Sequence, residues 1–226
     1  MERQSAGGLI LSLFVAASSH AAPQRALTPR PNEEKQITVQ VRNYARIELG
    51  VLLKAETVAK KILQEVGVDM LWVVCFDGST WSRDAACTNV RGPMVLTLNV
   101  VPSSMSQAFH LKGDVLGRAT EDGEKGFTRI AWIFNEPIKS FAVERDLSVA
   151  QLLGHVFAHE LGHLLLGTNS HSTMGLMHAH WSSRELLAAD QGELLFSASE
   201  SERIQEAVLA RWQARERGVQ SAAVQQ

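Results

Sequence analysis

The stretch Leu147–Leu166 (LSVAQLLGHVFAHELGHLLL) constrains the fold more than any other part of the chain. It predicts a helix with apolar residues on nearly every side, and a helix that is apolar all round is normally buried. The same helix also carries His155, His159, Glu160 and His163. Because a buried polar group without a partner costs about 2–7 kcal/mol, these side chains need partners, and a metal ion would serve several at once.

His159 and His163 lie one helical turn apart, so both imidazoles can point to the same place. Imidazole suits zinc at a distance of about 2.0–2.1 Å. Glu160 lies about 100° around the helix from His159, which places it near the metal but out of line with both rings. This geometry suits a general base that acts on water, as in the H-E-x-x-H motif, although a core helix can carry the same residues by coincidence.

The residues after the helix contain candidates for a third ligand. Gly167 can end the helix in a left-handed turn and let the chain fold back, and His171 follows it. His155 is a poorer candidate, because three histidines on one straight helix span about 12 Å and cannot converge on one ion. It is expected to be a packed residue beside the site. Asn169 carries a neutral amide, which is a poor ligand for zinc.

The segment His159–Met177 resembles the metzincin clan of zinc metalloproteases. The clan's pattern is H-E-x-x-H-x-x-G-x-x-H followed by a methionine turn beneath the metal. His159, Glu160 and His163 match this pattern position by position, and Gly175–Met177 looks like the methionine turn. The resemblance implies that Met177 supports the site without touching the metal, whereas an isolated methionine is usually core filler.

The end of the motif departs from the clan's pattern. Gly167 stands one place late, the expected third ligand falls on Asn169, and His171 comes two places later. His171 is therefore the favoured third ligand. Glu185 is the alternative, because another zincin group takes a glutamate from a later helix at broadly this separation. His178 and His180 either border the cleft or lie on the surface.

The remaining residues predict an α/β (α+β) domain. Alternating and continuous apolar runs predict strands over Ile37–Tyr44, Asp69–Cys75, Met94–Val101, Val115–Thr120 and Phe127–Phe134, and helical spacing predicts helices over Leu49–Val66, Leu147–Leu166 and Ser199–Glu216. The run Asp69–Cys75 is typical of a strand buried on both faces. Strand, helix and then several strands imply a mixed sheet with at least one parallel crossover.

The metzincin resemblance covers the same order of elements over roughly Ile37 to Trp181. It implies a zincin-like domain with a twisted mixed sheet of about five strands. The first helix would be the crossover helix, Leu147–Leu166 would be the zinc-binding helix, and a C-terminal helix would follow. The strand near Val115–Thr120 would border the substrate cleft.

The first residues predict a signal peptide rather than part of the domain. Residues 1–21 carry Arg3, a short apolar run and small residues before a cleavage point after Ala21. The run is too short to span a bilayer, which needs about 20 residues. Residues 22–36 are rich in proline and charge and predict a flexible leader, residues 37–216 predict a single metallopeptidase-like domain, and residues 217–226 predict a disordered tail.

Cys75 and Cys87 are the two cysteines of the chain, and an exported protein meets oxidising conditions. Their spacing is too long for C-x-x-C and no histidine lies near, which favours a structural disulfide over a metal or redox site. The formal net charge of -2 and the lack of a dense basic run give no support for nucleic-acid binding.

The resemblance implies a secreted or periplasmic zinc metallopeptidase of a bacterial branch of the clan, with endopeptidase action favoured. Zn²⁺ would be bound by His159, His163 and His171, and Glu160 would be the catalytic base. The expected partner is a peptide or protein substrate, with no membrane association after signal cleavage. Two alternatives stay open: a secreted zinc-binding or adhesion module without turnover, and a structural domain without metal.

Overall fold

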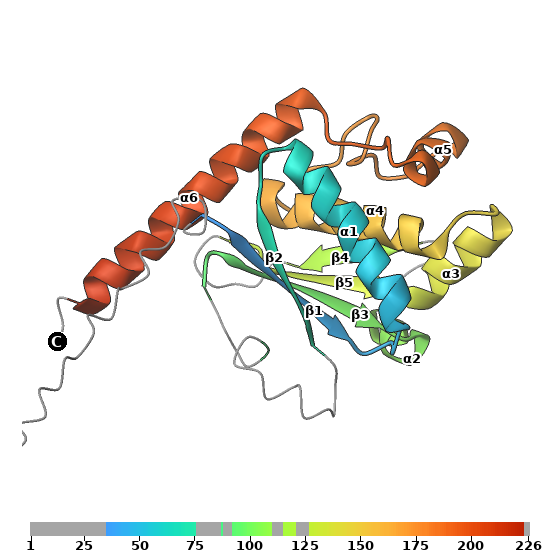
Figure 1. The fold of residues 1–226 in the computed structure, drawn as a ribbon, viewed down its shortest axis with the longest axis horizontal. Coiled ribbons are helices and arrows are strands. Elements are labelled where there is room, and N and C mark those ends of the chain that lie inside the picture. Colours follow the sequence, from blue (N-terminus) through green and yellow to red (C-terminus); the bar gives the residue numbers. More distant parts are fainter. Residues whose placement is uncertain (1–34, 76–86, 88–91, 110–114, 121–126, 224–226) are drawn as a thin grey trace, which may run out of the picture.

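The computed structural model describes residues 35–75, 87, 92–109, 115–120 and 127–223. In this part of the chain the fold is mixed α/β, with one twisted five-stranded sheet and six α-helices (Figure 1). The strands are β1 (Ile37–Asn43), β2 (Met70–Cys75), β3 (Val95–Val101), β4 (Gly117–Thr120) and β5 (Ile130–Phe134). The helices are α1 (Leu49–Glu65), α2 (Ser103–Ser106), α3 (Asn135–Glu144), α4 (Val149–Leu166), α5 (Ser183–Gln191) and α6 (Ala198–Ala223), with a short 3₁₀ turn η2 (Gln107–Phe109) after α2.

The strand order in the sheet is β2-β1-β3-β5-β4. Strand β1 pairs in parallel with both β2 and β3, β3 pairs in parallel with β5, and β4 pairs antiparallel to β5 at the edge. Helix α1 is the crossover between the parallel neighbours β1 and β2. The predicted mixed sheet of about five strands with a crossover helix is therefore confirmed.

The core lies between one face of the sheet and the pair α1 and α4, which lie side by side (Figure 1). Alternate strand residues are fully buried, as period-2 spacing requires: Ile37, Val39, Leu96, Leu98, Ala131 and Ile133. Nearly every residue of α4 is also buried, which confirms the expectation drawn from its apolar composition. The helix begins after the N-cap Ser148, whose side chain accepts from the Gln151 backbone N–H.

Two expectations about the strands and helices were wrong. Strand β2 is not buried on both faces: Leu71 is 50% exposed, because β2 is the edge strand of the sheet and apolar composition alone does not reveal sheet position. Helices α3 and α5 were not predicted. Both are short and only partly buried, so each has a weaker periodic signal than α1 or α4.

The C-terminal helix α6 continues to Ala223, so residues 217–223 are helical and the disordered tail predicted from residue 217 is corrected. Residues 224–226 lie outside the described residues, as do the predicted signal peptide 1–21 and nearly all of the leader 22–36. Among the described helices, none combines the length and the hydrophobicity needed to cross a bilayer.

A buried arginine of α6 joins the C-terminal helix to the core. Arg211 is 2% exposed, and its guanidinium donates hydrogen bonds to the carbonyl oxygens of Pro93 (2.9 Å), Thr128 (2.8 Å) and Leu164 (2.5 Å). It also lies over the Phe127 ring, 4.8 Å from the ring centroid. One side chain thus links α6 to the last turn of α4 and to the residues that precede β3 and β5.

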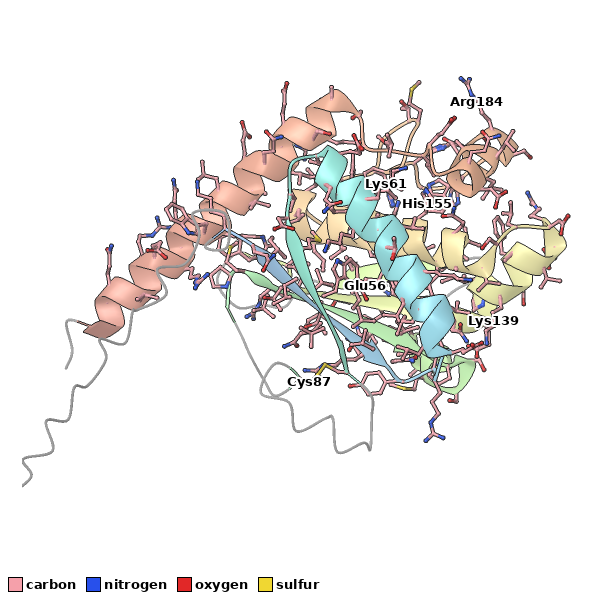
Figure 2. The ribbon with its side chains drawn as sticks, viewed as in Figure 1. Glu56, Lys61, Cys87, Lys139, His155 and Arg184 are labelled. Carbon is pink, nitrogen blue, oxygen red and sulfur yellow. A yellow bond between two sulfur atoms is a disulfide. The ribbon has the colours of Figure 1, made fainter. Side chains whose placement is uncertain are left out.

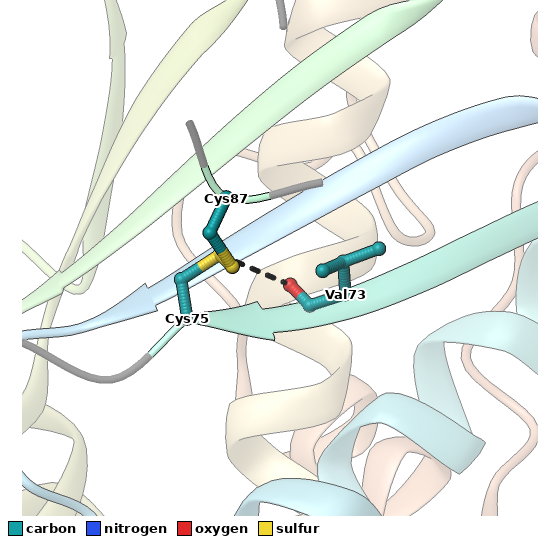
Figure 3. Close-up of a disulfide and its surroundings, with 3 residues drawn as sticks. All are labelled: Val73, Cys75 and Cys87. Atoms are coloured by element: carbon teal, nitrogen blue, oxygen red, sulfur yellow. Dashed lines mark hydrogen bonds between the residues drawn. A yellow bond between two sulfur atoms is a disulfide. The ribbon is translucent and has the colours of Figure 1, made fainter. Parts of the chain in front are cut away.

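Cys75 and Cys87 form the predicted disulfide, with an S–S distance of 2.06 Å and a Cα–Cα distance of 5.7 Å (Figure 3). Cys75 is the last residue of β2, so the bond fixes the chain where it leaves the edge strand. The Cys75 Sγ lies 4.0 Å from the Val73 carbonyl oxygen. This approach is a contact rather than a hydrogen bond, because a disulfide sulfur carries no proton.

Replacing both cysteines by serine is expected to lower the free energy of unfolding by about 3 kcal/mol, because the bond closes a loop with a sequence separation of 12. Urea unfolding of the wild type and of Cys75→Ser/Cys87→Ser measures the difference. The metal affinity should be unchanged, because both cysteines lie outside the histidine cluster. Equal unfolding midpoints would show that the bond does not stabilise the fold.

Candidate metal centre

Three histidines from two segments converge in the structure. His159 and His163 extend from α4, and His171 comes from the loop that folds back after the helix. The Nε2 atoms of His159 and His163 are 3.1 Å apart, and those of His163 and His171 are also 3.1 Å apart. One ligand atom from each of the three lies within 4.8 Å of the others. The longer spacing before His171 therefore does not keep it away from the pair on the helix.

The hydrogen bonds at the far side of two rings fix their tautomers. His159 Nδ1 lies 2.7 Å from the Leu176 carbonyl oxygen, which can only accept, so this nitrogen carries the proton. His163 Nδ1 lies 3.1 Å from Ser170 Oγ, and Ser170 donates its own proton to the Gly167 carbonyl oxygen at 2.6 Å. His163 must therefore also donate from Nδ1. In both rings Nε2 is left with a lone pair.

This arrangement fits a metal ion. Two lone pairs that face each other at 3.1 Å repel unless a cation lies between the nitrogens. Around a tetrahedral zinc ion with bonds of about 2.0–2.1 Å, ligand nitrogens are roughly 3.3 Å apart. Three imidazoles also leave one coordination position for another ligand, as in catalytic rather than purely structural sites. The donor set, the spacing and the tautomers all match this chemistry.

The electrostatic environment keeps the three rings neutral, which is the form that binds metal. Burial lowers the pKa of His159 from 6.5 to about 4. Burial also lowers the pKa of His163 to about 3, and the neighbouring His159 and His171 add to the effect. The pKa of His171 is lowered by burial and by the charges of His180 and His178.

Glu160 lies beside this cluster with its side chain turned toward β4. It is 3% exposed, and it is hydrogen-bonded to the Ala119 backbone. Burial raises its pKa from 4.5 to about 8, and the Ala119 hydrogen bond only partly opposes this. A methyl group at Gly117 would overlap the carboxyl group, so the glycine makes room for it. No described residue hydrogen-bonds to the second carboxyl oxygen, Oε2.

Met177 packs against α4. It is fully buried, and a methyl group at Gly162 of α4 would overlap its sulfur atom, so the glycine lets the turn approach the helix closely. The turn begins at Gly175, which has a φ of +80°. The Leu176 backbone N–H then donates to the Leu195 carbonyl oxygen at 3.1 Å. Met177 thus contacts α4 at Gly162, the residue before His163, and it is not among the residues that line the cavity.

A cavity of about 990 Å³ contains the candidate site. Its wall is formed by residues 115–120, which include β4, by α4, and by residues 178–181 after the methionine turn. His159, Glu160, His163 and His171 all line it. The structure therefore gathers the predicted ligands and the predicted base in one accessible space.

The alternatives to His171 as third ligand lie outside the histidine cluster or are poor ligands. Glu185 caps α5 by accepting from the Ser182 backbone N–H at 2.6 Å, and its other oxygen lies 2.7 Å from His178 Nδ1. It is not among the residues of the histidine cluster. Asn169 lines the cavity, and its neutral amide is a poor ligand for zinc.

His155 is a packed residue, as expected. It is fully buried on the side of α4 that faces α5 (Figure 2), and its Nδ1 lies 2.8 Å from the Gln151 carbonyl oxygen. Its ring meets that of Trp181 edge-on, with centroids 6.5 Å apart. Trp181 also contacts His159 edge-on at 5.8 Å and donates from Nε1 to the Leu176 carbonyl oxygen at 3.1 Å.

Sequence reasoning missed the residues that orient the ligands. Ser170, the Leu176 carbonyl and Trp181 all support the histidines, but none belongs to the motif. Ser170 could have been noticed, because a hydroxyl so close to a proposed ligand can hydrogen-bond it. A backbone carbonyl leaves no trace in the sequence.

The stability of the metal-free protein is expected to fall on both sides of neutral pH. The pKa of Glu160 rises from 4.5 to about 8 on folding, so the folded state keeps a proton that the unfolded chain releases, and stability falls as the pH rises through that window. His159 and His163 behave oppositely: their pKa values fall from 6.5 to about 4 and about 3, so stability falls as the pH drops below about 6.5.

Urea unfolding in a chelator between pH 5 and pH 9 measures this profile. Glu160→Gln should remove the Glu160 contribution, which is on the order of 4 kcal/mol between pH 5 and pH 9. The loss above neutral pH should disappear, and the loss below pH 6.5 should become steeper, because protonated Glu160 partly offsets it in the wild type. A variant that loses stability above neutral pH as steeply as the wild type would contradict the assignment to Glu160.

No model of a protein family matches the sequence, and no curated protein matches it. Among solved structures, the chain is similar to the crystal structure of archaemetzincin from Methanopyrus kandleri, with 16% sequence identity, 80% of this chain and 99% of that chain covered, and a TM-score of 0.47. A likeness this distant assigns neither fold nor function, so the candidate site rests on its own geometry.

Proposed function

We propose that this chain is a secreted zinc-dependent metallopeptidase with a metzincin-like active site. The observation that carries the proposal is the convergence of three imidazoles, two with Nε2 lone pairs fixed toward each other, beside a buried glutamate in an open cavity. His159, His163 and His171 would hold the zinc. When bound, zinc supplies Lewis acidity that polarises the scissile carbonyl group and lowers the pKa of water.

Glu160 is the proposed general base. Glu160 lines the cavity beside the histidines, and its buried Oε2, to which no described residue hydrogen-bonds, would accept the proton of the attacking water. Without metal, burial keeps this group protonated at neutral pH, whereas a nearby cation favours the carboxylate. After accepting the proton, Glu160 would pass it to the nitrogen of the leaving amine.

Strand β4 supports peptide binding in this cavity. It is the last strand in the sheet order, so one of its edges has no neighbouring strand among the described residues, and residues 115–120 form part of the cavity wall. An extended peptide can add to such an edge through backbone hydrogen bonds, which favours peptides and proteins as substrates. Endopeptidase action is favoured because the metzincin clan, which the motif resembles, leans toward endopeptidases.

Export from the cell is also part of the proposal. The predicted signal peptide at residues 1–21 and the disulfide Cys75–Cys87 both favour an oxidising compartment outside the cytoplasm. A secreted zinc-binding or adhesion module would show the same cysteines and histidines but no cleavage.

Substitution of Glu160 is expected to abolish cleavage and preserve metal binding. In zinc-loaded protein, Glu160→Gln should reduce kcat by about 10²–10⁴-fold, because the water then lacks its base. A broad library of fluorogenic peptides measures activity, and elemental analysis measures zinc. Zinc-loaded wild type that cleaves nothing would support the binding module, and failure to bind zinc would exclude both functions.

The third ligand is tested by zinc affinity. His171→Ala should weaken zinc binding by at least about tenfold, because two histidines then remain where zinc sites usually have three protein ligands. Glu185→Gln should leave the affinity unchanged, because Glu185 caps α5 and contacts His178. Competition titration with a chromogenic chelator measures both. The reverse result would assign the ligand to Glu185.

A further inference from the structure

His178 is a cavity residue that the proposed mechanism has not used. Its side chain is 30% exposed and lines the same cavity as the histidine cluster and Glu160. Its Nδ1 atom lies 2.7 Å from a carboxyl oxygen of Glu185. A histidine held by a carboxylate at the wall of a candidate active site is typical of a functional group rather than a surface residue.

The carboxylate of Glu185 is itself fixed. It is the third residue of α5, and its second oxygen accepts from the Ser182 backbone N–H at 2.6 Å to complete a capping box. Partial burial acts to raise the pKa of Glu185, but hydrogen bonds from Ser182 and His178 outweigh it and the net pKa is lowered. Glu185 therefore stays a carboxylate and is a rigid acceptor.

The backbone of His178 is also anchored, next to the segment that carries the third proposed ligand. The His178 N–H donates to the Gly175 carbonyl oxygen at 3.1 Å, and Ser172 N–H donates to the Met177 carbonyl oxygen at 2.9 Å. Ser172 and His178 form a bridge between the two segments. Since Ser172 follows His171 directly, His178 lies close to the metal-binding end of the cavity.

These contacts determine which nitrogen of His178 can meet a ligand. A carboxylate can only accept, so Nδ1 carries a proton and Nε2 is the atom left for the cavity. In the cationic form of the ring Nε2 is an N–H donor, and Glu185 balances its charge. The donor role therefore requires the cationic ring, which is part of the proposal below, because a neutral ring with its proton on Nδ1 has a lone pair at Nε2. Glu160, which packs against β4 at Gly117, comes from a different part of the cavity wall than His178.

We propose that His178 stabilises the transition state of peptide hydrolysis by donating a hydrogen bond from Nε2 to the scissile carbonyl oxygen, with Glu185 as its positioning residue. The inference rests on the proposed peptidase function. As the water oxygen bonds to the carbonyl carbon, the π electron pair moves onto the carbonyl oxygen, and the His178 N–H faces that charge without transferring its proton. When the C–N bond breaks, its electron pair stays on nitrogen, which takes the proton carried by Glu160.

A donor of this kind acts mainly on kcat. The carbonyl oxygen gains negative charge only in the transition state, so the hydrogen bond is stronger there than in the bound substrate. Removal of one such donor lowers kcat by about 10²–10³-fold in enzymes where it has been measured. The expected signature of His178→Ala is therefore a loss of kcat of that order, with KM changed by less than about threefold.

Three variants separate this role from a structural one. His178→Ala removes the donor, and Glu185→Gln removes the charge while glutamine can still complete the capping box. Glu185→Gln should lower kcat by a smaller factor than His178→Ala. Arg184→Ala is the matched control, because Arg184 is an exposed residue of the same turn of α5 whose side chain extends into solvent (Figure 2). It should keep wild-type kcat.

The experiment combines kinetics with binding to zinc-loaded full-length protein. Zinc affinity and the thermal unfolding midpoint are measured for each variant. Affinity is then measured for a phosphinic peptide, whose tetrahedral oxygens resemble the transition state, and for a thiol peptide, which has no such oxygen. His178→Ala should weaken phosphinic peptide binding by about 10²–10³-fold and leave thiol peptide binding within about threefold of wild type.

The outcomes distinguish this inference from the proposed function. If wild type cleaves peptides and His178→Ala matches it in kcat and in phosphinic peptide affinity, the role of His178 is overturned while the peptidase stands. An equal loss of zinc, thiol peptide and phosphinic peptide affinity would show a structural role and also overturn it. If zinc-loaded wild type cleaves nothing, the peptidase function and the catalytic role of His178 are both overturned, and the phosphinic peptide reports only whether His178 binds tetrahedral oxygens. A protein that binds no zinc overturns both proposals.

Discussion

The hydrogen bond from His159 to the Leu176 carbonyl oxygen, at 2.7 Å, is the contact on which the rest of the site depends. It joins the buried helix α4 to the turn that follows the ligand loop, and it leaves the lone pair of His159 on Nε2. Trp181 donates to the same carbonyl, so one backbone oxygen ties together a ligand, the turn and the cavity wall. Met177 then fills the space against Gly162. The geometry of the candidate metal site and the packing of the core therefore depend on the same contacts.

The sequence was most informative where one local rule determined the geometry. His159, Glu160 and His163 lie on one helix, so helical periodicity alone predicted their arrangement. The position of His171 depended on a loop whose length departs from the metzincin pattern. The structure suggests a reason for the longer loop, because it includes Ser170, whose hydroxyl accepts from His163 Nδ1. No periodic signal encodes such a contact.

The features that the sequence misjudged or left open depended on long-range position. The exposure of Leu71 follows from the place of β2 at the edge of the sheet, which its apolar composition could not reveal. The spacing of Glu185 is compatible with a third metal ligand, yet its carboxylate accepts from the Ser182 backbone N–H and from His178. The capping pattern from Ser182 to Glu185 was visible in the sequence, but the partner across the turn was not. Contacts between residues close in the chain were predictable, whereas the choice of Glu185 between a metal ion and His178 could be seen only in the structure.

Synthesis from the N-terminus determines when the contacts of Arg211 can form. Arg211 follows every proposed ligand in the chain, and its guanidinium binds the carbonyl oxygen of Leu164, the neighbour of His163. Translation therefore delivers all three histidines before the side chain that fastens the end of their helix. The last turn of α4 can acquire this partner only after α6 has been synthesised, so the end of the helix that carries His163 is held by a residue that comes later in the chain than every proposed ligand.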